Sequence, residues 1–319
     1  MKRTIQGTAA IIALCAALPA LAADYPDLRP AYEQGWENPD DDVRFEFGTA
    51  YWYSWGGQDL AIPTSAGALD ATSRDNTHIG DLHGKIEDLS TQTYLSGKAG
   101  IGFSTTGTYD ISPAAAGDIG PGSRIGYAGA DFGWLPLGNM REGTTAGGFV
   151  GYHYWKEAPD IGTGEYATAF AAGVPTTLGD ARNDLDIHAL RLGIRGTAEF
   201  DMFDIQAEVA AVPYAHISGT LGGSAPDGFA FPGGTFYERA QTTLTGRGYG
   251  VMAESMVGFR PTENIALRVG GRAWYLEGQL DATLTTNRAG IDPQPAETIA
   301  TSYARYFRYG LMAELTGRF

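Results

Sequence analysis

The sequence predicts an all-β protein, an antiparallel transmembrane β-barrel with ten strands as the best count and eight or twelve as alternatives. Three observations lead to this prediction. The chain begins with the pattern of an export signal, its second half alternates apolar and polar residues in runs of strand length, and it ends in Phe319, which we interpret as a C-terminal assembly signal. Alternation with a period of two puts one set of side chains on lipid and the other set in the lumen.

The N-terminal segment has the three parts of a signal peptide. Lys2 and Arg3 form a basic start, residues 11–18 form a short apolar core, and Ala20-Leu21-Ala22 matches a cleavage site. The sequence therefore predicts a signal peptide over residues 1–22, cleaved before Ala23. We expect the mature chain to be exported to the outer membrane of a Gram-negative bacterium.

The composition excludes several classes of protein. Charged residues make up 18% of the chain and the mean hydropathy is -0.18, and no apolar run is long enough for a mature membrane helix. The single cysteine, Cys15, lies inside the signal peptide, so the mature chain has no disulfide and no thiol chemistry. Loss of Lys2 and Arg3 changes the formal charge from -15 to -17, which argues against binding to nucleic acid.

The mature chain divides into a short lead-in and the barrel. Residues 23–42 are acidic and are predicted to lie in the periplasm, and residues 43–319 are predicted to form the barrel, with no second domain. In 43–55 the apolar side chains alternate with Arg44 and Glu46. Further strands are expected in 124–134, 148–156 and 185–200, and the segment 85–111 should hold two strands whose turn the sequence does not locate.

The back half has the clearest alternation, in four runs over 204–216, 248–259, 265–275 and 307–319. Each run has a continuous apolar face that ends in aromatic residues, which is typical of a lipid-facing band with an aromatic girdle. A soluble β-sandwich would also alternate, but the export signal and Phe319 favour a membrane barrel. The barrel must close, because an open edge would leave backbone groups unpaired in lipid.

The connections between the runs are of two kinds. Residues 200–203 and 260–263 are tight turns and 137–139 is fairly short, as expected for periplasmic turns. Four long connections rich in Gly, Pro, Thr and Asp are predicted to be external loops, namely 57–82, 158–183, 219–238 and 286–299. With both barrel ends in the periplasm, the number of strands must be even.

The polar face carries both signs of charge near the periplasmic ends of the strands. In a narrow barrel these side chains must neutralise one another, because an unpaired buried charge costs several kcal/mol or more. We therefore predict a lumen plugged by ion pairs, with a water-filled channel as the alternative. The predicted lumen residues are Arg44, Glu46, Arg191, Arg195, Glu199, Glu208, Glu254, Arg268, Arg272, Glu314 and Arg318.

Several stretches carry a resemblance to a known family. The sequence resembles the last three strands of omptin-type barrels in 248–251, 260–265, 270–275 and 308–319. It is even more similar to a group of uncharacterised outer-membrane β-barrel proteins of alphaproteobacteria, which 148–154 and 210–214 also fit. The resemblance covers roughly residues 124–319.

The resemblance implies a ten-stranded barrel and raises the question of proteolysis. Omptins pair an Asp-x-Asp with an Asp-x-His across an external cleft, where the groups activate a water molecule. The position matching the Asp-x-His falls near Thr220-Leu221-Gly222, which has neither an acid nor a base, and His216 has no Asp two residues before it. The family's catalytic residues therefore do not carry over, and we lean against an enzyme.

Two other groups of polar residues are candidates for a site. Asp184, Asp186 and His188 contain both motifs, but they share the parity of Leu190 and are predicted to point outward at the external rim. His78 and His83, in the first predicted external loop, lie near acids and could ligate a metal, although such loop histidines are usually solvated. We predict no metal site and no cofactor.

These observations leave three hypotheses for function. The leading one is a monomeric, non-enzymatic barrel whose external loops contact lipopolysaccharide, envelope partners or environmental ligands. The second is an omptin-like surface hydrolase that uses Asp184, Asp186 and His188, and the third is a narrow small-solute channel. The expected partners are outer-membrane lipid, lipopolysaccharide and the barrel assembly machinery.

Overall fold

The computed structural model describes residues 42–64, 67–112, 115–160, 165–166, 176–177, 184–221, 229–231, 235–262, 264–288 and 296–319. The predicted signal peptide (1–22) and residues 23–41 of the predicted periplasmic segment lie outside this part of the chain. No helix within the described ranges is long and apolar enough to cross a membrane.

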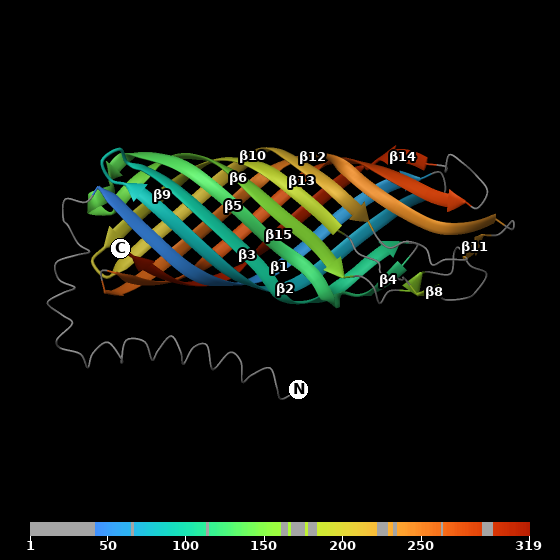
Figure 1. Cartoon of the computed structure of the whole chain (residues 1–319), viewed down its shortest axis with the longest axis horizontal. Helices are drawn as coiled ribbons and strands as arrows, with labels where there is room; N and C mark the ends of the chain where they lie inside the picture. Colours follow the sequence, from blue (N-terminus) through green and yellow to red (C-terminus); the bar gives the residue numbers. More distant parts are fainter. Residues whose placement is uncertain are drawn as a thin grey trace, which may run out of the picture. The chain divides into compact units, whose positions relative to one another are not determined.

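Ten long strands make up the wall of the barrel (Figure 1). They are β1 (Val43–Thr64), β2 (Gly67–Asp88), β3 (Thr93–Ser112), β5 (Gly120–Asn139), β6 (Thr144–Asp160), β9 (Asp184–Phe200), β10 (Phe203–Leu221), β12 (Thr235–Thr262), β13 (Ile265–Arg288) and β15 (Tyr303–Arg318). Five short strands accompany them at one end, namely β4 (Ala115–Asp118), β7 (Glu165–Tyr166), β8 (Thr176–Thr177), β11 (Phe229–Phe231) and β14 (Ala296–Ala300).

The long strands close into a ring. Each pairs antiparallel with the next long strand along the chain, and β1 also pairs with β15, where Glu46 lies opposite Arg318. Closure leaves no long open edge, which is the condition for a sheet to reside in lipid. The prediction of a closed antiparallel barrel with ten strands is confirmed.

The turns at the end of the barrel where β1 begins are short. Between β2 and β3 the Asp88 carboxylate accepts hydrogen bonds from the backbone N–H groups of Ser90 (2.9 Å) and Thr91 (3.2 Å), which closes an Asx-type turn. Between β5 and β6 a 3-10 turn, Met140–Glu142, is followed by Gly143 at φ 75°, a left-handed conformation that favours glycine. The turn that the sequence left open in 85–111 is therefore residues 89–92.

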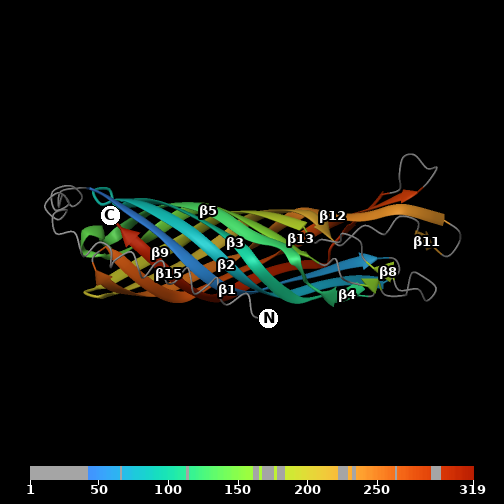
Figure 2. The same cartoon turned by 60° about the horizontal axis from the view of Figure 1, so that its bottom comes forward.

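At the opposite end the strands extend into segments that were expected to be loops. The segments 57–64 and 67–82, expected in a loop, belong to β1 and β2, and β12 and β13 extend furthest of all, with 28 and 24 residues (Figure 2). About 9–11 residues suffice for a strand to cross a bilayer, so these strands continue well beyond it. The outward face of the β1 and β2 extensions is largely polar and their inward face mixes polar with apolar side chains, so they resembled a loop in the sequence.

The outward face carries a band of exposed apolar side chains. Leu267, Val269 and Leu311 are 49%, 64% and 64% exposed, so these side chains point away from the lumen. Tyrosines such as Tyr249 and Tyr309 end the band, and Thr243 and Thr245 further along β12 are exposed and polar. This order of apolar band, aromatic girdle and polar extension is the pattern of a lipid-facing barrel surface.

Three kinds of layer follow one another along the interior that the described strands enclose. Charged side chains occupy the half near the short turns, an aromatic layer follows, and the strand extensions enclose fully buried apolar side chains such as Leu60, Ile187 and Leu280. In the charged half, aromatic rings pack directly against inward-facing glycines. The Tyr94 ring, for example, lies so close to Gly133 that a Cβ added at this glycine would be 2.1 Å from it. The apolar upper layer was not predicted.

Candidate functional site

Arg268 is the centre of the charged network nearest the short-turn end. Its side chain is 2% exposed and contacts Asp204 at 2.9 Å, Glu46 at 2.9 Å and Glu314 at 2.8 Å. These carboxylates come from β10, β1 and β15, so one guanidinium on β13 joins four strands. Lys85 adds a second contact to Glu46 at 2.5 Å. The arrangement crosses the lumen instead of following one strand.

A second set of ion pairs lies deeper in the lumen. Arg272 contacts Glu254 at 2.6 Å and Asp81 at 3.2 Å, the latter on β2 across the barrel. Lys98 joins Glu254 at 3.1 Å to Glu208 at 3.5 Å. These ion pairs join strands β2, β3, β10, β12 and β13.

The second set of ion pairs continues through β9. Arg191, which is 3% exposed, contacts Asp131 and Glu208, each at 2.8 Å. Arg195 lies 3.8 Å from Glu208 and donates a hydrogen bond of 3.0 Å to Gln206. Arg191 therefore ties β9 to both β5 and β10.

A third cluster of ion pairs, around Glu199, lies next to the short turns. The Glu199 carboxylate contacts Arg318 at 2.8 Å and Arg260 at 2.6 Å. A Cβ on Gly143 would meet the Glu199 side chain at 2.6 Å, so the turn between β5 and β6 packs against this cluster. All the lumen residues predicted from the sequence are thus members of ion pairs.

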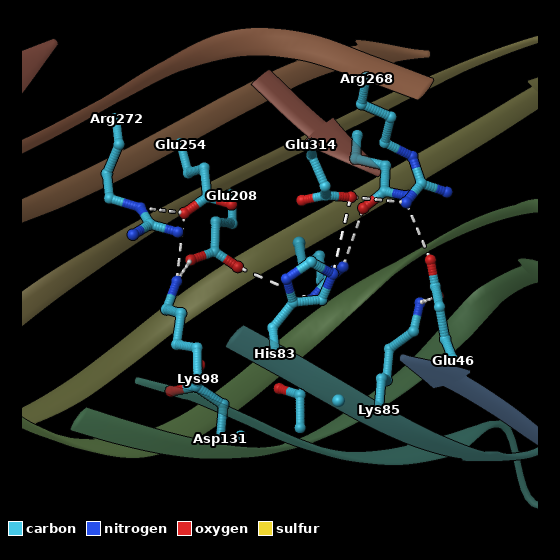
Figure 3. A pocket seen from close by; sticks show the side chains of 15 residues that line it. Glu46, His83, Lys85, Lys98, Asp131, Glu208, Glu254, Arg268, Arg272 and Glu314 are labelled. Carbon is cyan, nitrogen blue, oxygen red and sulfur yellow. Dashed lines mark hydrogen bonds and ion pairs between the residues drawn. The ribbon is translucent and has the colours of Figure 1, made fainter. Parts of the chain in front are cut away.

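A small cavity lies between these clusters (Figure 3). Its volume is about 60 Å³, and Lys98, Glu208, Glu254, Arg268 and Glu314 are among the side chains that line it. One ordered water molecule needs about 10–15 Å³ of such space. The cavity can therefore hold a few water molecules that hydrate the charges.

An aromatic layer covers the charged network on its far side. It consists of Trp52, Tyr127, His153, Trp155 and Trp274, with ring centroids 4.5–6.0 Å apart. The Arg272 guanidinium lies 5.2 Å from the rings of Trp52 and Tyr127, a cation–π arrangement. These side chains are at most 4% exposed, so the layer separates the lower lumen from the far end.

One buried charged cluster lies beside the aromatic layer toward the far end. Arg308 is fully buried and contacts Asp75 at 2.9 Å and Glu157 at 2.6 Å. Glu157 also accepts a 2.7 Å hydrogen bond from the Trp155 indole N–H, and Thr77 donates one of 2.6 Å to Asp75. The cluster ties β15 to β2 and β6 at the level where the interior becomes apolar.

Sequence reasoning missed much of this network. Asp75 and Asp81 were not predicted as lumen residues because they lie in 57–82, which was expected to be a loop, and Lys85 and Glu87 were missed because the strands expected in 85–111 could not be placed. A signal was present in the sequence: the odd-numbered positions from 75 to 87 include all four of these charged residues, and these positions are buried or half-buried in the strand. Lys98, Asp131 and Asp204 were also missed, since each stands alone among small or apolar neighbours.

The predicted rim cluster lies on the outer face. Asp184, Asp186 and His188 alternate with fully buried Leu185 and Ile187, so all three point outward. They do not face a cleft.

Neighbouring strands occupy the polar groups of this rim cluster. Lys156 forms ion pairs with both Asp184 and Asp186, and Arg124 lies 2.9 Å from Asp184. The Tyr152 hydroxyl lies 2.6 Å from Nδ1 of His188. Tyr154 also hydrogen-bonds Asp186.

The structure corrects the predicted location of His78 and His83. His78 and His83 were expected in an external loop, but both lie in β2. His78 points outward and its Nδ1 lies 2.5 Å from the Tyr51 hydroxyl, whereas His83 points inward, 3.6 Å from Asp81 and 3.8 Å from Glu314. Among the described residues, no group of three or more His, Cys, Asp or Glu side chains could hold a metal ion.

Comparison with known proteins gives the fold. No protein-family model matches the chain, and no curated protein matches it. Among solved structures, the outer membrane protease OmpT from Escherichia coli is similar over 90% of this chain and 99% of that chain, with 10% identity and a TM-score of 0.65. The translocator domain of the autotransporter NalP from Neisseria meningitidis matches over 94% and 97% of the two chains, with 13% identity and a TM-score of 0.38.

The chain thus has an outer-membrane β-barrel fold, and the likeness at 10% identity concerns the fold alone. Its lumen is occupied by side chains of the barrel wall that are joined by ion pairs. Each described lumen carboxylate in the charged network contacts at least one cation.

Proposed function

We propose that this protein is an integral outer-membrane barrel with a closed lumen, which serves a structural or surface-binding role and has no channel or proteolytic activity. One observation carries the proposal: the lumen is crossed by ion pairs that are backed by a buried aromatic layer. A pathway for solutes would require both layers to separate.

Closure is favoured by the cost of opening. Moving Arg268 away from its partners would leave Asp204, which is 1% exposed, without its cation. Removing one partner from a buried pair costs about 3–5 kcal/mol, and several such pairs bridge the lumen. Thermal motion therefore opens this interior rarely.

Single-channel recording in planar lipid bilayers tests the closed lumen. We expect no steady conductance from the wild-type protein across a range of voltages. The matched variant replaces both Trp52 and Trp274, which lie 4.8 Å apart in the aromatic layer, by alanine. A stable conductance in the nanosiemens range from the wild-type barrel would overturn the proposal in favour of the narrow channel.

The outer surface of the barrel suggests the classes of partner that we propose. The apolar band is suited to outer-membrane lipid, and the polar strand extensions beyond the girdle, such as Thr243 and Thr245, are suited to contact lipopolysaccharide or ligands outside the cell. We further propose a cleaved signal peptide, a monomer, and recognition of Phe319 by the barrel assembly machinery. Native mass spectrometry of the protein purified from membranes would report the mass of the processed chain and any retained lipopolysaccharide.

A surface hydrolase is the second candidate, because the OmpT structure shares the barrel architecture. Its active residues would be Asp184, Asp186 and His188. Since Lys156 and Arg124 neutralise the two carboxylates on the outer face, we expect no activation of water there. Cleavage of a peptide library by the wild-type protein, abolished in His188→Ala, would establish the hydrolase and refute our assignment.

A further inference from the structure

The buried cluster around Arg308 holds one more acid than base. Arg308 contacts Asp75 and Glu157, and among the described residues no other cation contacts either carboxylate. The three side chains are 0%, 1% and 3% exposed, in that order. The cluster is tightly enclosed, because a Cβ on Gly56 would collide with the guanidinium and would lie 2.6 Å from Oδ2 of Asp75. Two ionised carboxylates beside one guanidinium would therefore leave one negative charge in excess.

The surroundings of the cluster do not supply the missing positive charge. On the side of the short turns, the aromatic layer separates it from the rest of the charged network. On the far side, the next inward side chains on β1 and β15 are Gln58 and Tyr306, which are fully buried and carry no charge at neutral pH. The residues paired with Glu157 on β5 and β9 are Ile125 and Leu185, both apolar.

The contacts of the two carboxylates favour a proton over a metal ion as the balancing charge. Both oxygens of Asp75 accept hydrogen bonds from Arg308, and one also accepts from Thr77. One oxygen of Glu157 accepts from Arg308 and the other from Trp155. A metal ion needs several oxygen ligands, and no group of three or more acidic, His or Cys side chains in the described ranges could hold one. A proton needs a single lone pair of one oxygen.

The contacts are unequal, which places the proton on Glu157. Arg308 binds Asp75 through two nitrogens, at 2.9 and 3.0 Å, whereas it reaches Glu157 through one, at 2.6 Å. A bidentate guanidinium is the arrangement that suits an ionised carboxylate best. Oε2 of Glu157 receives only the indole N–H of Trp155, at 2.7 Å, so this oxygen keeps a lone pair that a proton can occupy.

We propose that Glu157 carries a proton on Oε2 in the folded barrel near neutral pH, and that this proton balances the charges of Asp75 and Arg308. The proton comes from solvent and forms an O–H bond, because a buried carboxyl group without a cation of its own is more stable neutral than charged. A glutamic acid in water loses its proton near about pH 4.3. Folding therefore takes up one proton at this site, and the stability of the barrel depends on pH.

The sign of this pH dependence follows from the proton uptake. Between about pH 4.3 and the pH at which folded Glu157 ionises, the folded barrel binds one proton more than the unfolded chain, so its stability falls as the pH rises. Above that pH, ionised Glu157 faces Asp75 on β2 with only a shared cation. The other titratable groups around it, in the part of the chain that is described, are Arg308 and Tyr306 on β15.

Infrared spectroscopy of the full chain in lipid vesicles tests for the proton directly, because a protonated carboxylic acid has a C=O band that a carboxylate lacks. Glu157→Gln keeps the shape of the protonated side chain and removes the acid. Glu277→Gln is the matched control, since Glu277 lies on the outer face of β13, where the Tyr249 hydroxyl donates to it at 2.6 Å. We expect the band at about pH 6 in the wild type and in the control, and its loss in Glu157→Gln.

Urea unfolding of the same proteins in vesicles at about pH 6 and about pH 9 measures the linked effect on stability. Relative to the wild type, Glu157→Gln should become more stable as the pH rises, by up to about tenfold in the unfolding equilibrium constant per pH unit. Glu277→Gln should follow the wild type. A wild-type spectrum without the band at about pH 6 would overturn the proposal. So would a band that survives in Glu157→Gln, or parallel pH profiles for that variant and the wild type.

Discussion

Replacing Arg268 by methionine tests whether the ion pairs of the lumen hold the barrel together. Arg268 binds Asp204 through two contacts, of 2.9 and 3.2 Å, and also reaches Glu46 and Glu314. After the substitution Glu46 keeps Lys85, at 2.5 Å, but Asp204 has no other cationic partner among the described residues. Its carboxylate, 1% exposed, would then be a buried charge without compensation.

The expected loss in the free energy of unfolding follows from these contacts. Breaking a buried pair by removing one partner costs about 3–5 kcal/mol, and we expect Arg268→Met to lower the free energy of unfolding by this amount. Adding Asp204→Asn removes the orphaned charge, so the double variant should recover about 1–3 kcal/mol of the loss. An exposed pair serves as control: Arg124 is 57% exposed beside Asp184, and Arg124→Met should cost about 0–1 kcal/mol.

The assay is equilibrium unfolding in urea with the barrel in lipid vesicles, followed by tryptophan fluorescence. The layer formed by Trp52, Trp155 and Trp274 lies next to the network and reports its loss. Two results would contradict the reasoning. One is a loss below about 1 kcal/mol for Arg268→Met, and the other is a double variant that is less stable than the single one.

Three further predictions concern the packing, the orientation and the rim of the barrel. Gly133→Ala should lower the free energy of unfolding by about 1–3 kcal/mol, because its Cβ would lie 2.1 Å from the Tyr94 ring, whereas Gly148→Ala should be neutral or stabilising in the same urea titration. Leu311→Arg should cost about 2–4 kcal/mol in vesicles if the outward band lies in lipid, while Thr245→Arg beyond the girdle should cost less than 1 kcal/mol; equal costs would refute the placement of the band. Asp186→Asn should leave peptide hydrolysis at the background rate of the wild type in a fluorogenic peptide assay, because Asp186 points outward and pairs with Lys156, and a drop in a measurable rate would contradict this assignment.

The barrel and its outward face can be inferred from the order of the residues alone. Alternation is a local property, because successive side chains of a strand point to opposite sides whatever the rest of the chain does. The run that contains Leu267 and Val269 could thus be assigned to one face without knowing its neighbours. The outward direction of Asp186 and His188 followed from the same parity with Leu190.

The pairing of the charges and the length of the strands depend instead on contacts between distant parts of the chain. The contact of Arg272 with Asp81 joins residues 191 positions apart, and it depends on the register of every strand between them. The extension of β1 and β2 was hidden for a related reason. Outside the bilayer the outward face of these two strands is polar, and their inward face mixes apolar side chains such as Leu60 with polar ones such as Gln58. The pattern of the membrane-spanning part is therefore lost, and only the ladder between the two strands shows that they continue. The interior also becomes apolar there, because side chains such as Leu60 and Leu280 meet across a narrow lumen and exclude water from the end of the barrel.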